Sequence, residues 1–218
     1  MLAEQLEQMR NATMERMPQH IIEVFKDSLI DIRNSGLKEK SLQLGDRVPN
    51  ALLKSSTGET KTIATLHSSE FLVLNFYRGG WCPYCNLELR AYERLQNDFS
   101  EIGMSIIAIS AEIPHLTKDT TVKNSITYPI LTDVDAKLMK ALGIVFQLDE
   151  ATKREYANFG VDLAHIQGND NYELPVPAIY VINKQREIVF VHFEEDYMTR
   201  LEPEVLLEKC KTLVNTHQ

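Results

Sequence analysis

Two cysteines separated by two residues, Cys82 and Cys85, are the residues of this sequence whose types and spacing best support chemistry. The apolar run 71–77 before them is typical of a buried strand, and two glycines interrupt it. Pro83 suits the first position of a helix. The sequence therefore predicts a strand, a glycine turn and a helix, with Cys82 at the helix N-terminus and Cys85 in its first turn.

The N-terminus of a helix is a favourable place for a thiolate. Unpaired amide N–H groups and the positive end of the helix dipole stabilise an anion there, which lowers the pKa of a thiol. A spacing of three residues also places both sulfurs on one face, where they can join as a disulfide. We expect the pair to cycle between dithiol and disulfide. A zinc half-site is less favoured because two further ligands are missing nearby, and an unreactive pair is the other alternative.

Four residues around the pair have two interpretations each. Arg78 either stabilises a neighbouring thiolate or is a solvated residue at a strand end. Glu88, one helical turn after Cys85, either relays protons or is an exposed helix charge. Trp81 and Tyr84 either form an apolar collar around the sulfurs or are ordinary packing residues. The sequence leaves these alternatives open.

Two residues far along the chain also bear on the site. Pro177 directly precedes the predicted strand 178–182, so it belongs either to a tight, cis turn or to a plain strand entry. Cys210 lies on the apolar face of the last predicted helix, which favours buried packing over a third redox thiol.

Composition limits the classes of function. The 218 residues are 44% hydrophobic and 25% charged, which is enough for one sizeable core or for one domain with an appendage. A formal net charge of −8 argues against a nucleic-acid binder. The N-terminus lacks the pattern of a secretory signal, and no apolar run reaches the roughly 18 residues of a membrane span. We therefore expect a cytoplasmic protein with no membrane or nucleic-acid partner and no metal.

The chain divides into an N-terminal helical arm, residues 1–40, and a domain at 41–218. The arm contains one or two amphipathic helices with Pro18 as the break, and it either caps its own domain, which packing favours, or binds a partner. The domain alternates strands and helices, which predicts a mostly parallel sheet with helices on both faces. An insertion at 144–174 is either a functional lid or a packed excursion. The predicted strands are 51–54, 60–63, 71–77, 105–110, 128–132, 178–182 and 187–193, and the predicted helices are 83–99, 113–124, 135–142 and 203–214.

Three sequence blocks together resemble the peroxiredoxin-like branch of the alkyl hydroperoxide reductase and thiol-specific antioxidant family. They are residues 45–49, 75–89 and 175–182, and the likeness covers about 44–214. The resemblance implies an α/β thioredoxin fold, with a central mixed sheet flanked by helices, and the helical arm lies outside it as an N-terminal extension. It also implies thiol-dependent reduction of peroxides or disulfides without a cofactor.

The resemblance leaves the roles of the two cysteines open. Aligned on Glu88, the peroxide-attacking cysteine of the family is Cys85, with Cys82 at its threonine position and Arg78 at its proline position. Pro177 stands where typical members have an arginine, and it resembles the cis-proline of thioredoxin. On the thioredoxin pattern Cys82, the more exposed thiol, attacks a disulfide and Cys85 resolves it. On the peroxiredoxin pattern Cys85 becomes a sulfenic acid and Cys82 condenses with it.

The leading expectation is an antioxidant oxidoreductase that reduces hydroperoxides through the Cys82–Cys85 disulfide. A thioredoxin-type or low-molecular-weight thiol would re-reduce it. The alternatives are a protein disulfide reductase without significant peroxidase activity and a non-catalytic binding module. A homodimer is a further expectation.

Overall fold

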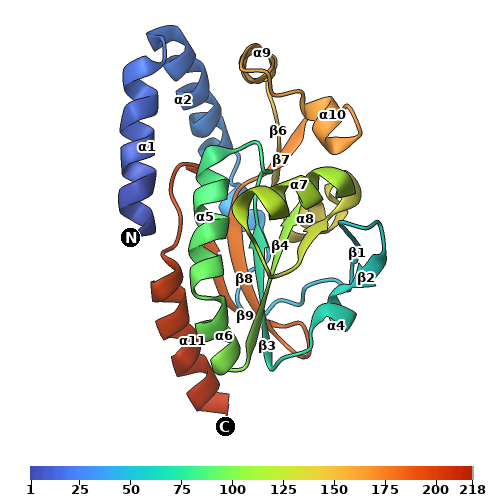
Figure 1. The fold of residues 1–218 in the computed structure, drawn as a ribbon. Coiled ribbons are helices and arrows are strands. Elements are labelled where there is room, and N and C mark those ends of the chain that lie inside the picture. Colours follow the sequence, from blue (N-terminus) through green and yellow to red (C-terminus); the bar gives the residue numbers. More distant parts are fainter. Residues whose placement is uncertain (218) are drawn as a thin grey trace.

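A seven-stranded mixed sheet forms the centre of the computed structural model, which describes residues 1–217 (Figure 1). Strand β3 (Phe71–Phe76) lies inside the sheet with all six side chains buried, as a continuous apolar run predicts. Its neighbours are β4 (Met104–Ser110), which is parallel, and β8 (Ala178–Asn183), which is antiparallel. The strand order is β2-β1-β5-β4-β3-β8-β9. The other strands are β1 (Leu52–Ser55), β2 (Thr60–Thr62), β5 (Ile130–Thr132) and β9 (Ile188–Phe193).

The expectation of a mostly parallel sheet is wrong, because only β3–β4 and β4–β5 pair in parallel. The other four pairs are antiparallel. Helical crossovers connect β3 to β4 and β4 to β5, whereas short turns join β1 to β2 and β8 to β9. Two strands joined by a short turn pair antiparallel, so the last two connections form hairpins. The predicted β8–β9 hairpin and the mixed α/β class are confirmed.

The helix after the cysteines is shorter than the sequence pattern indicates. The predicted helix 83–99 divides at Leu95, whose φ of −107° and ψ of 6° leave the helical region. Figure 1 shows α5 and α7 together in front of the strands. The helices of this part of the chain are α4 (Ile63–Leu66), α5 (Pro83–Arg94), α6 (Gln96–Glu101), α7 (Pro114–Asn124), the short 3-10 helix Val134–Ala136, α8 (Lys137–Leu142) and α11 (Pro203–His217).

The N-terminal arm packs on its own chain. It consists of α1 (Leu2–Arg16), α2 (Gln19–Asn34) and α3 (Leu37–Lys40), with the expected break at Pro18. Helix α1 runs beside α5 (Figure 1), and Leu2 and Leu6 belong to the main core. The backbone amides of Leu2 and Ala3 donate to the Glu202 carboxylate at 3.0 and 2.6 Å. These contacts fix the free end of the arm against the chain segment before α11.

The 144–174 segment is also packed. It contains the antiparallel pair β6 (Val145–Gln147) and β7 (Glu173–Pro175), with α9 (Glu150–Asn158) and α10 (Leu163–Gln167) between them. Phe25 of α2 and Tyr156 of α9 belong to one small apolar cluster, with ring centroids 5.3 Å apart. The insertion is therefore joined to the N-terminal arm through a shared core.

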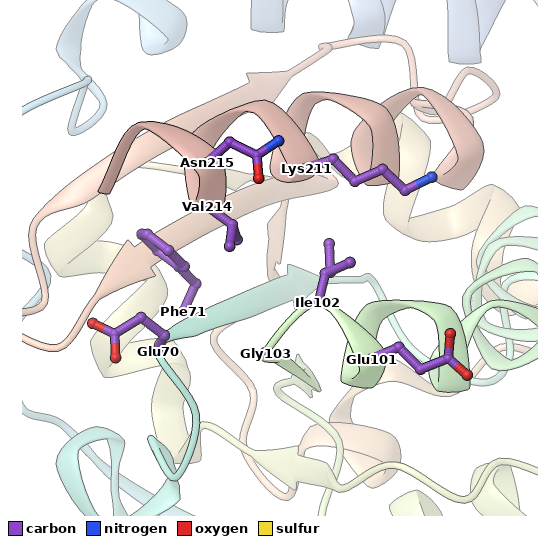
Figure 2. A pocket seen from close by; sticks show the side chains of 8 residues that line it. All are labelled: Glu70, Phe71, Glu101, Ile102, Gly103, Lys211, Val214 and Asn215. Atoms are coloured by element: carbon purple, nitrogen blue, oxygen red, sulfur yellow. The ribbon is translucent and has the colours of Figure 1, made fainter. Parts of the chain in front are cut away.

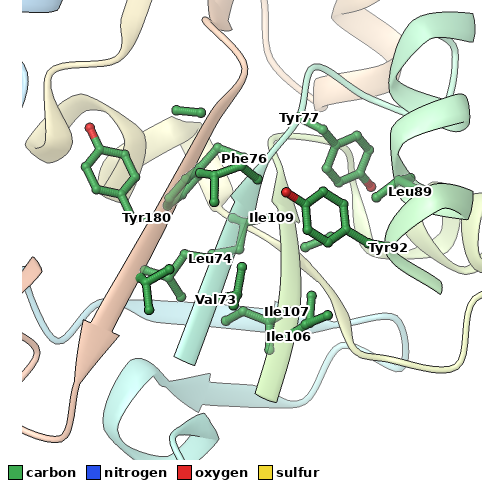
Figure 3. Close-up of a cluster of buried hydrophobic side chains, with 14 of the residues drawn as sticks. Val73, Leu74, Phe76, Tyr77, Leu89, Tyr92, Ile106, Ile107, Ile109 and Tyr180 are labelled. Atoms are coloured by element: carbon green, nitrogen blue, oxygen red, sulfur yellow. The ribbon is translucent and has the colours of Figure 1, made fainter. Parts of the chain in front are cut away.

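The main core holds the cysteine helix against the sheet. Leu89 and Tyr92 of α5 are fully buried beside Ile109 of β4, and Phe76 meets the Tyr180 ring edge-on at 5.9 Å (Figure 3). Each fully buried side chain of this size contributes about 1.5–3 kcal/mol of transfer free energy. The position of the α5 N-terminus is therefore set by well-packed contacts one to three turns away.

Candidate active site

The cysteine pair lies where the sequence places it. Cys82 is the N-cap residue of α5, Pro83 is the first helical residue and Cys85 lies in the first turn. The Cys82 amide donates to the Gly79 carbonyl at 3.1 Å, and the Cys82 carbonyl accepts from the Asn86 amide at 3.1 Å. The strand, turn and helix that the sequence predicts are thus present.

A buried carboxylate ties the glycine turn to the sheet. Glu112 accepts from the Gly80 amide at 2.9 Å and from the Tyr77 hydroxyl at 3.2 Å. A Cβ on Gly80 would lie 1.9 Å from Thr120 Oγ1 of α7, so only glycine fits this close approach. Sequence reasoning did not identify Glu112, because a single acid after a strand carries no distinguishing pattern. The contacts hold the turn that precedes Cys82.

Both thiols are buried, and Cys82 is the more exposed of the two only through the cavity that it lines. Cys82 is 1% exposed and Cys85 is 0% exposed, because both sulfurs lie under surrounding side chains. The two still differ in surroundings, since Cys82 lines a cavity of about 590 Å³ and Cys85 does not. A substrate in that cavity would meet Cys82 first.

The two thiols differ in ionisation because their surroundings differ. Burial opposes a charge on Cys82, but the hydrogen bond with Cys85 and the charges of Arg78 and Arg200 outweigh burial and lower the pKa of Cys82 to about 6. Burial, the hydrogen bond with Cys82 and the negative charge there raise the pKa of Cys85 well above its ordinary value. Of the two thiols, Cys82 is therefore the one that ionises more readily.

Arg78 is a buried cation in an aromatic cage, so the solvated interpretation is wrong. It is 2% exposed, and its guanidinium carbon lies 4.2, 4.8 and 5.4 Å from the ring centroids of Tyr197, Trp81 and Tyr156. It also donates to the Tyr156 hydroxyl. Among residues 1–217 Arg78 has no ion pair with a carboxylate. Burial opposes the charge of Arg78, but the surrounding side chains, including the Cys82 thiolate, outweigh burial and raise its pKa, so Arg78 stays charged.

Glu88 is likewise buried, which excludes an exposed helix charge. It is 1% exposed, and its carboxylate accepts from Arg200 Nε at 2.6 Å. Burial raises the pKa of Glu88 to about 7, and the Arg200 charge opposes that rise. Arg200 Nη2 lies 3.3 Å from Cys85 Sγ. Sequence reasoning missed Arg200, because it lies in an irregular segment without periodicity, 112 residues from Glu88.

The aromatic residues beside the pair line the end of the cavity at Cys82, which we call its floor. Trp81 meets Tyr156 edge-on at 5.3 Å, and Tyr84 meets Tyr197 edge-on at 5.9 Å. All four rings line the cavity together with Cys82. The collar interpretation therefore describes their placement, although two of its members, Tyr156 and Tyr197, come from segments that sequence reasoning did not connect to the site.

Pro177 and Cys210 have plainer surroundings. No cis peptide bond occurs in the described chain, so the likeness of Pro177 to a cis-proline is wrong. Pro177 is a buried strand-entry proline before Ala178, which pairs with Phe76 at the sheet edge from which the cysteine turn departs. Cys210 is 0% exposed, and burial raises its pKa to about 12, as expected of a packing residue.

The cavity lies between the cysteine turn, the N-terminal arm and α9. Most of its wall is apolar, with contributions from α1, α2 and α9. A larger hollow of about 780 Å³ lies at the opposite end of β3, between Phe71, α6 and α11, and contains no cysteine (Figure 2). No cluster of three or more His, Cys, Asp or Glu residues with metal-binding geometry occurs in the part of the chain that is described, and no helix there is long and apolar enough to cross a membrane.

Comparison with known proteins identifies the family. The AhpC/TSA family model matches residues 44–191. The chain is 27% identical to the thiol-disulfide oxidoreductase ResA of Halalkalibacterium halodurans, over 73% of this chain and 78% of that protein. It is 28% identical to the 1-Cys peroxiredoxin PER1 of Hordeum vulgare, over 59% and 61% of the two chains.

Solved structures show the same fold. The peroxidoxin BcpB of Mycobacterium tuberculosis superimposes with a TM-score of 0.63 at 19% identity, over 81% of this chain and 99% of that one. The chain spans between half and four fifths of the length of the curated relatives it matches. The matched segment begins after the N-terminal arm and contains both cysteines of the pair. The chain belongs to the AhpC/TSA family of peroxiredoxin-like thiol oxidoreductases and has the thioredoxin fold of its peroxiredoxin neighbours.

Proposed function

We propose that this protein is a thiol peroxidase that reduces hydroperoxides through Cys82 and Cys85, with Cys82 as the attacking sulfur. The supporting observation is the placement of Cys82, which lines the cavity beside the buried Arg78 cation and has a lowered pKa. Cys85 has a raised pKa and does not line the cavity. The accessible sulfur is thus also the nucleophilic one.

The reaction takes two steps at the pair. The Cys82 thiolate attacks one peroxide oxygen, so that an S–O bond forms, the O–O bond breaks and the leaving alkoxide takes up a proton to become an alcohol. Cys82 is then a sulfenic acid. The Cys85 sulfur attacks Cys82, and the hydroxyl leaves with the Cys85 proton as water. One hydroperoxide thereby gives one alcohol and one water, and the two thiols become a disulfide.

The two arginines assist different sulfurs. Arg78 stabilises the Cys82 thiolate before attack and the negative oxygen that leaves during it. Arg200, at 3.3 Å from Cys85 Sγ, stabilises negative charge on Cys85 as that thiol loses its proton in the second step. Glu88 holds the Arg200 guanidinium in position through its ion pair at 2.6 Å.

Return to the dithiol needs two electrons from outside the chain. We propose a thioredoxin-type protein or a small thiol as the donor, since either attacks the disulfide by thiol exchange and releases both cysteines. Three free cysteines suit a reducing compartment, and the cytoplasm remains our prediction. A homodimer also remains a prediction, which analytical ultracentrifugation would test.

A second candidate function is the reduction of disulfides. One observation favours it, because a cavity of about 590 Å³ in front of Cys82 accommodates a group much larger than a peroxide. In this reaction the Cys82 thiolate attacks a substrate disulfide and Cys85 releases the substrate from the mixed disulfide.

A single-turnover experiment separates the two functions. Pre-reduced protein receives one equivalent of cumene hydroperoxide, and peroxide loss and free thiols are measured; a parallel sample receives insulin. We expect one peroxide consumed and two thiols lost per chain, with the same result in Cys210→Ala, the matched control. Peroxide loss no faster than with a free thiol, together with insulin reduction, would make the protein a disulfide reductase. Absence of both reactions would leave the binding-module alternative.

A further inference from the structure

The cavity wall facing Cys82 comes largely from outside the matched family segment. The match begins at residue 44, whereas α1 and α2 end at Arg16 and Asn34. Helix α2 contributes Ile22, Lys26, Ile30 and Arg33 to the cavity, at spacings of three and four that place them on one helical face. The arm thus adds a surface to a reaction centre that the family segment supplies.

This wall is held in place on both sides. Arg10 of α1 pairs with Asp196 at 3.5 Å, next to the aromatic cage. Phe25 of α2 packs against Tyr156 of α9 and, with centroids 6.3 Å apart, against Phe159, which directly follows α9. The cavity is therefore preformed by contacts between the arm and two distant parts of the chain.

The cavity is large and apolar in relation to a small peroxide. Its volume of about 590 Å³ lies within the range of sites that enclose drug-sized ligands, whereas a water molecule occupies roughly 30 Å³. Ile30 and Phe159 line it while remaining 41% and 50% exposed, so apolar surface continues to its mouth. Hydrogen peroxide alone would leave most of this surface uncovered.

The floor and the mouth differ in polarity from the walls. At the floor, Arg78 Nε and Trp81 Nε1 are buried without a hydrogen-bond partner among the described residues. At the mouth, Lys26 and Arg33 are exposed and have no ion pair in residues 1–217. Two free cations at a cavity mouth favour an anion, in a chain whose formal net charge is −8.

We propose that the N-terminal arm makes the enzyme selective for amphipathic anionic hydroperoxides, of the fatty-acid class. The hydrocarbon chain would lie along the apolar wall, the carboxylate at Lys26 and Arg33, and the peroxide oxygens beside Cys82. The floor donors would receive those oxygens, which removes the cost of leaving polar atoms buried and unpaired. Turnover of such a substrate rests on the proposed peroxidase function, whereas its binding does not.

Binding is measured without chemistry through the fluorescence of Trp81, the single tryptophan. The probes are a hydroxy fatty acid, which is the expected product, and its methyl ester, both below their micelle concentrations. We expect the acid to bind about five- to tenfold more tightly than the ester, and Lys26→Gln/Arg33→Gln to remove the difference. The control Lys38→Gln, an exposed cation outside the cavity, should keep it. Equal binding of acid and ester to the wild type, or the same loss in the control, would overturn the proposal.

Turnover gives a second and separate readout. We expect kcat/KM for the fatty-acid hydroperoxide to exceed that for its methyl ester by about the same five- to tenfold, and the double variant to remove this preference without changing hydrogen peroxide turnover. Ile30→Gln should weaken both long-chain substrates and spare hydrogen peroxide. A loss of hydrogen peroxide turnover in the double variant would contradict a selective role for Lys26 and Arg33. Tight acid binding without reduction of any peroxide would instead refute the proposed function and leave the binding site standing.

Discussion

At the scale of single residues, the ionisation of Cys82 depends on two cations that only the folded chain brings beside it. Arg78 is only four residues away, yet its burial depends on Tyr156 and Tyr197 closing over it. Arg200 is remote in sequence and reaches the pair only in the folded chain. The helix N-terminus favours a thiolate by itself, and the hydrogen bond with Cys85 together with these two charges overcomes the burial that opposes it.

The charge of Arg78 is testable through the pH dependence of Cys82. Because the folded-state pKa of Cys82 is lowered to about 6, its alkylation by iodoacetamide should rise as pH passes 6 and level off above about pH 7. Arg78→Met removes the charge and should move this midpoint upward, toward the ordinary thiol value. Arg78→Lys keeps the charge and is the control. An unchanged midpoint in Arg78→Met would show that Arg78 does not stabilise the thiolate.

The buried Glu88 predicts a pH dependence of stability. Its pKa is about 7 in the folded chain against 4.5 in the unfolded chain, so between these values the folded state holds more protons. The contribution of Glu88 protonation to the free energy of unfolding is therefore complete below pH 4.5 and is lost as pH rises through 7. The decline is on the order of 3 kcal/mol. Urea unfolding across this window should show a smaller decline in Glu88→Gln than in wild type. An equal decline in the free energy of unfolding in wild type and Glu88→Gln would contradict this role of Glu88. The same change in the exposed control Glu101→Gln would also contradict it.

At the scale of elements, the glycine turn is held between the sheet and α7. A methyl group on Gly80 would meet Thr120 Oγ1 at 1.9 Å, so Gly80→Ala should cost about 1–3 kcal/mol and slow Cys82 alkylation as the turn moves. Thr120→Ala in the same chain removes the nearest atom and should recover part of both losses. Thermal unfolding and alkylation rates measure them. If the effects of the two substitutions on stability simply add, the methyl group added at Gly80 and the Thr120 side chain do not clash.

The hydrogen bond between Arg78 and Tyr156 links the insertion to the site. Tyr156→Phe keeps the ring packing of α9 but leaves Arg78 without the hydroxyl that accepts its hydrogen bond. We expect a loss of about 1–3 kcal/mol, because a buried donor is left unpaired. Amide hydrogen exchange in α9 should become faster, while exchange in α11 stays unchanged. Equal exchange in α9 would mean that apolar packing alone holds the insertion.

Sequence pattern predicted elements better than their pairing. The run 71–77 and the glycine turn predicted β3 and the α5 N-terminus, because apolar periodicity and turn residues act locally. The parallel character of the sheet was overestimated, since alternation of strands and helices holds only from β3 to β5. The end of α5 at Leu95 was also missed, because no glycine or proline marks it.

At the scale of the whole molecule, residues from four separate parts of the chain form the site. The cysteine turn supplies the sulfurs, α1 and α2 supply a wall, α9 supplies Tyr156, and the segment before α11 supplies Tyr197 and Arg200. Sequence alone predicted the first of these and left the arm and the insertion as alternatives. The rest could not be predicted, because Glu88–Arg200 and Arg78–Tyr156 are contacts across 112 and 78 residues with no shared pattern. The domain boundary near residue 40 and that of the insertion stay predictions, and Gln218 lies outside the described residues.

The attacking sulfur is tested most directly by trapping the sulfenic acid. Pre-reduced Cys85→Ser and Cys82→Ser each receive one equivalent of cumene hydroperoxide with dimedone present, and mass spectrometry locates the adduct. The serine hydroxyl in Cys85→Ser can still donate to Cys82, so that thiolate remains stabilised. We predict a stoichiometric adduct on Cys82 in Cys85→Ser and little or none on Cys85 in Cys82→Ser. An adduct on Cys85 in Cys82→Ser, with none on Cys82 in the other variant, would contradict the assignment and make Cys85 the peroxide-attacking sulfur.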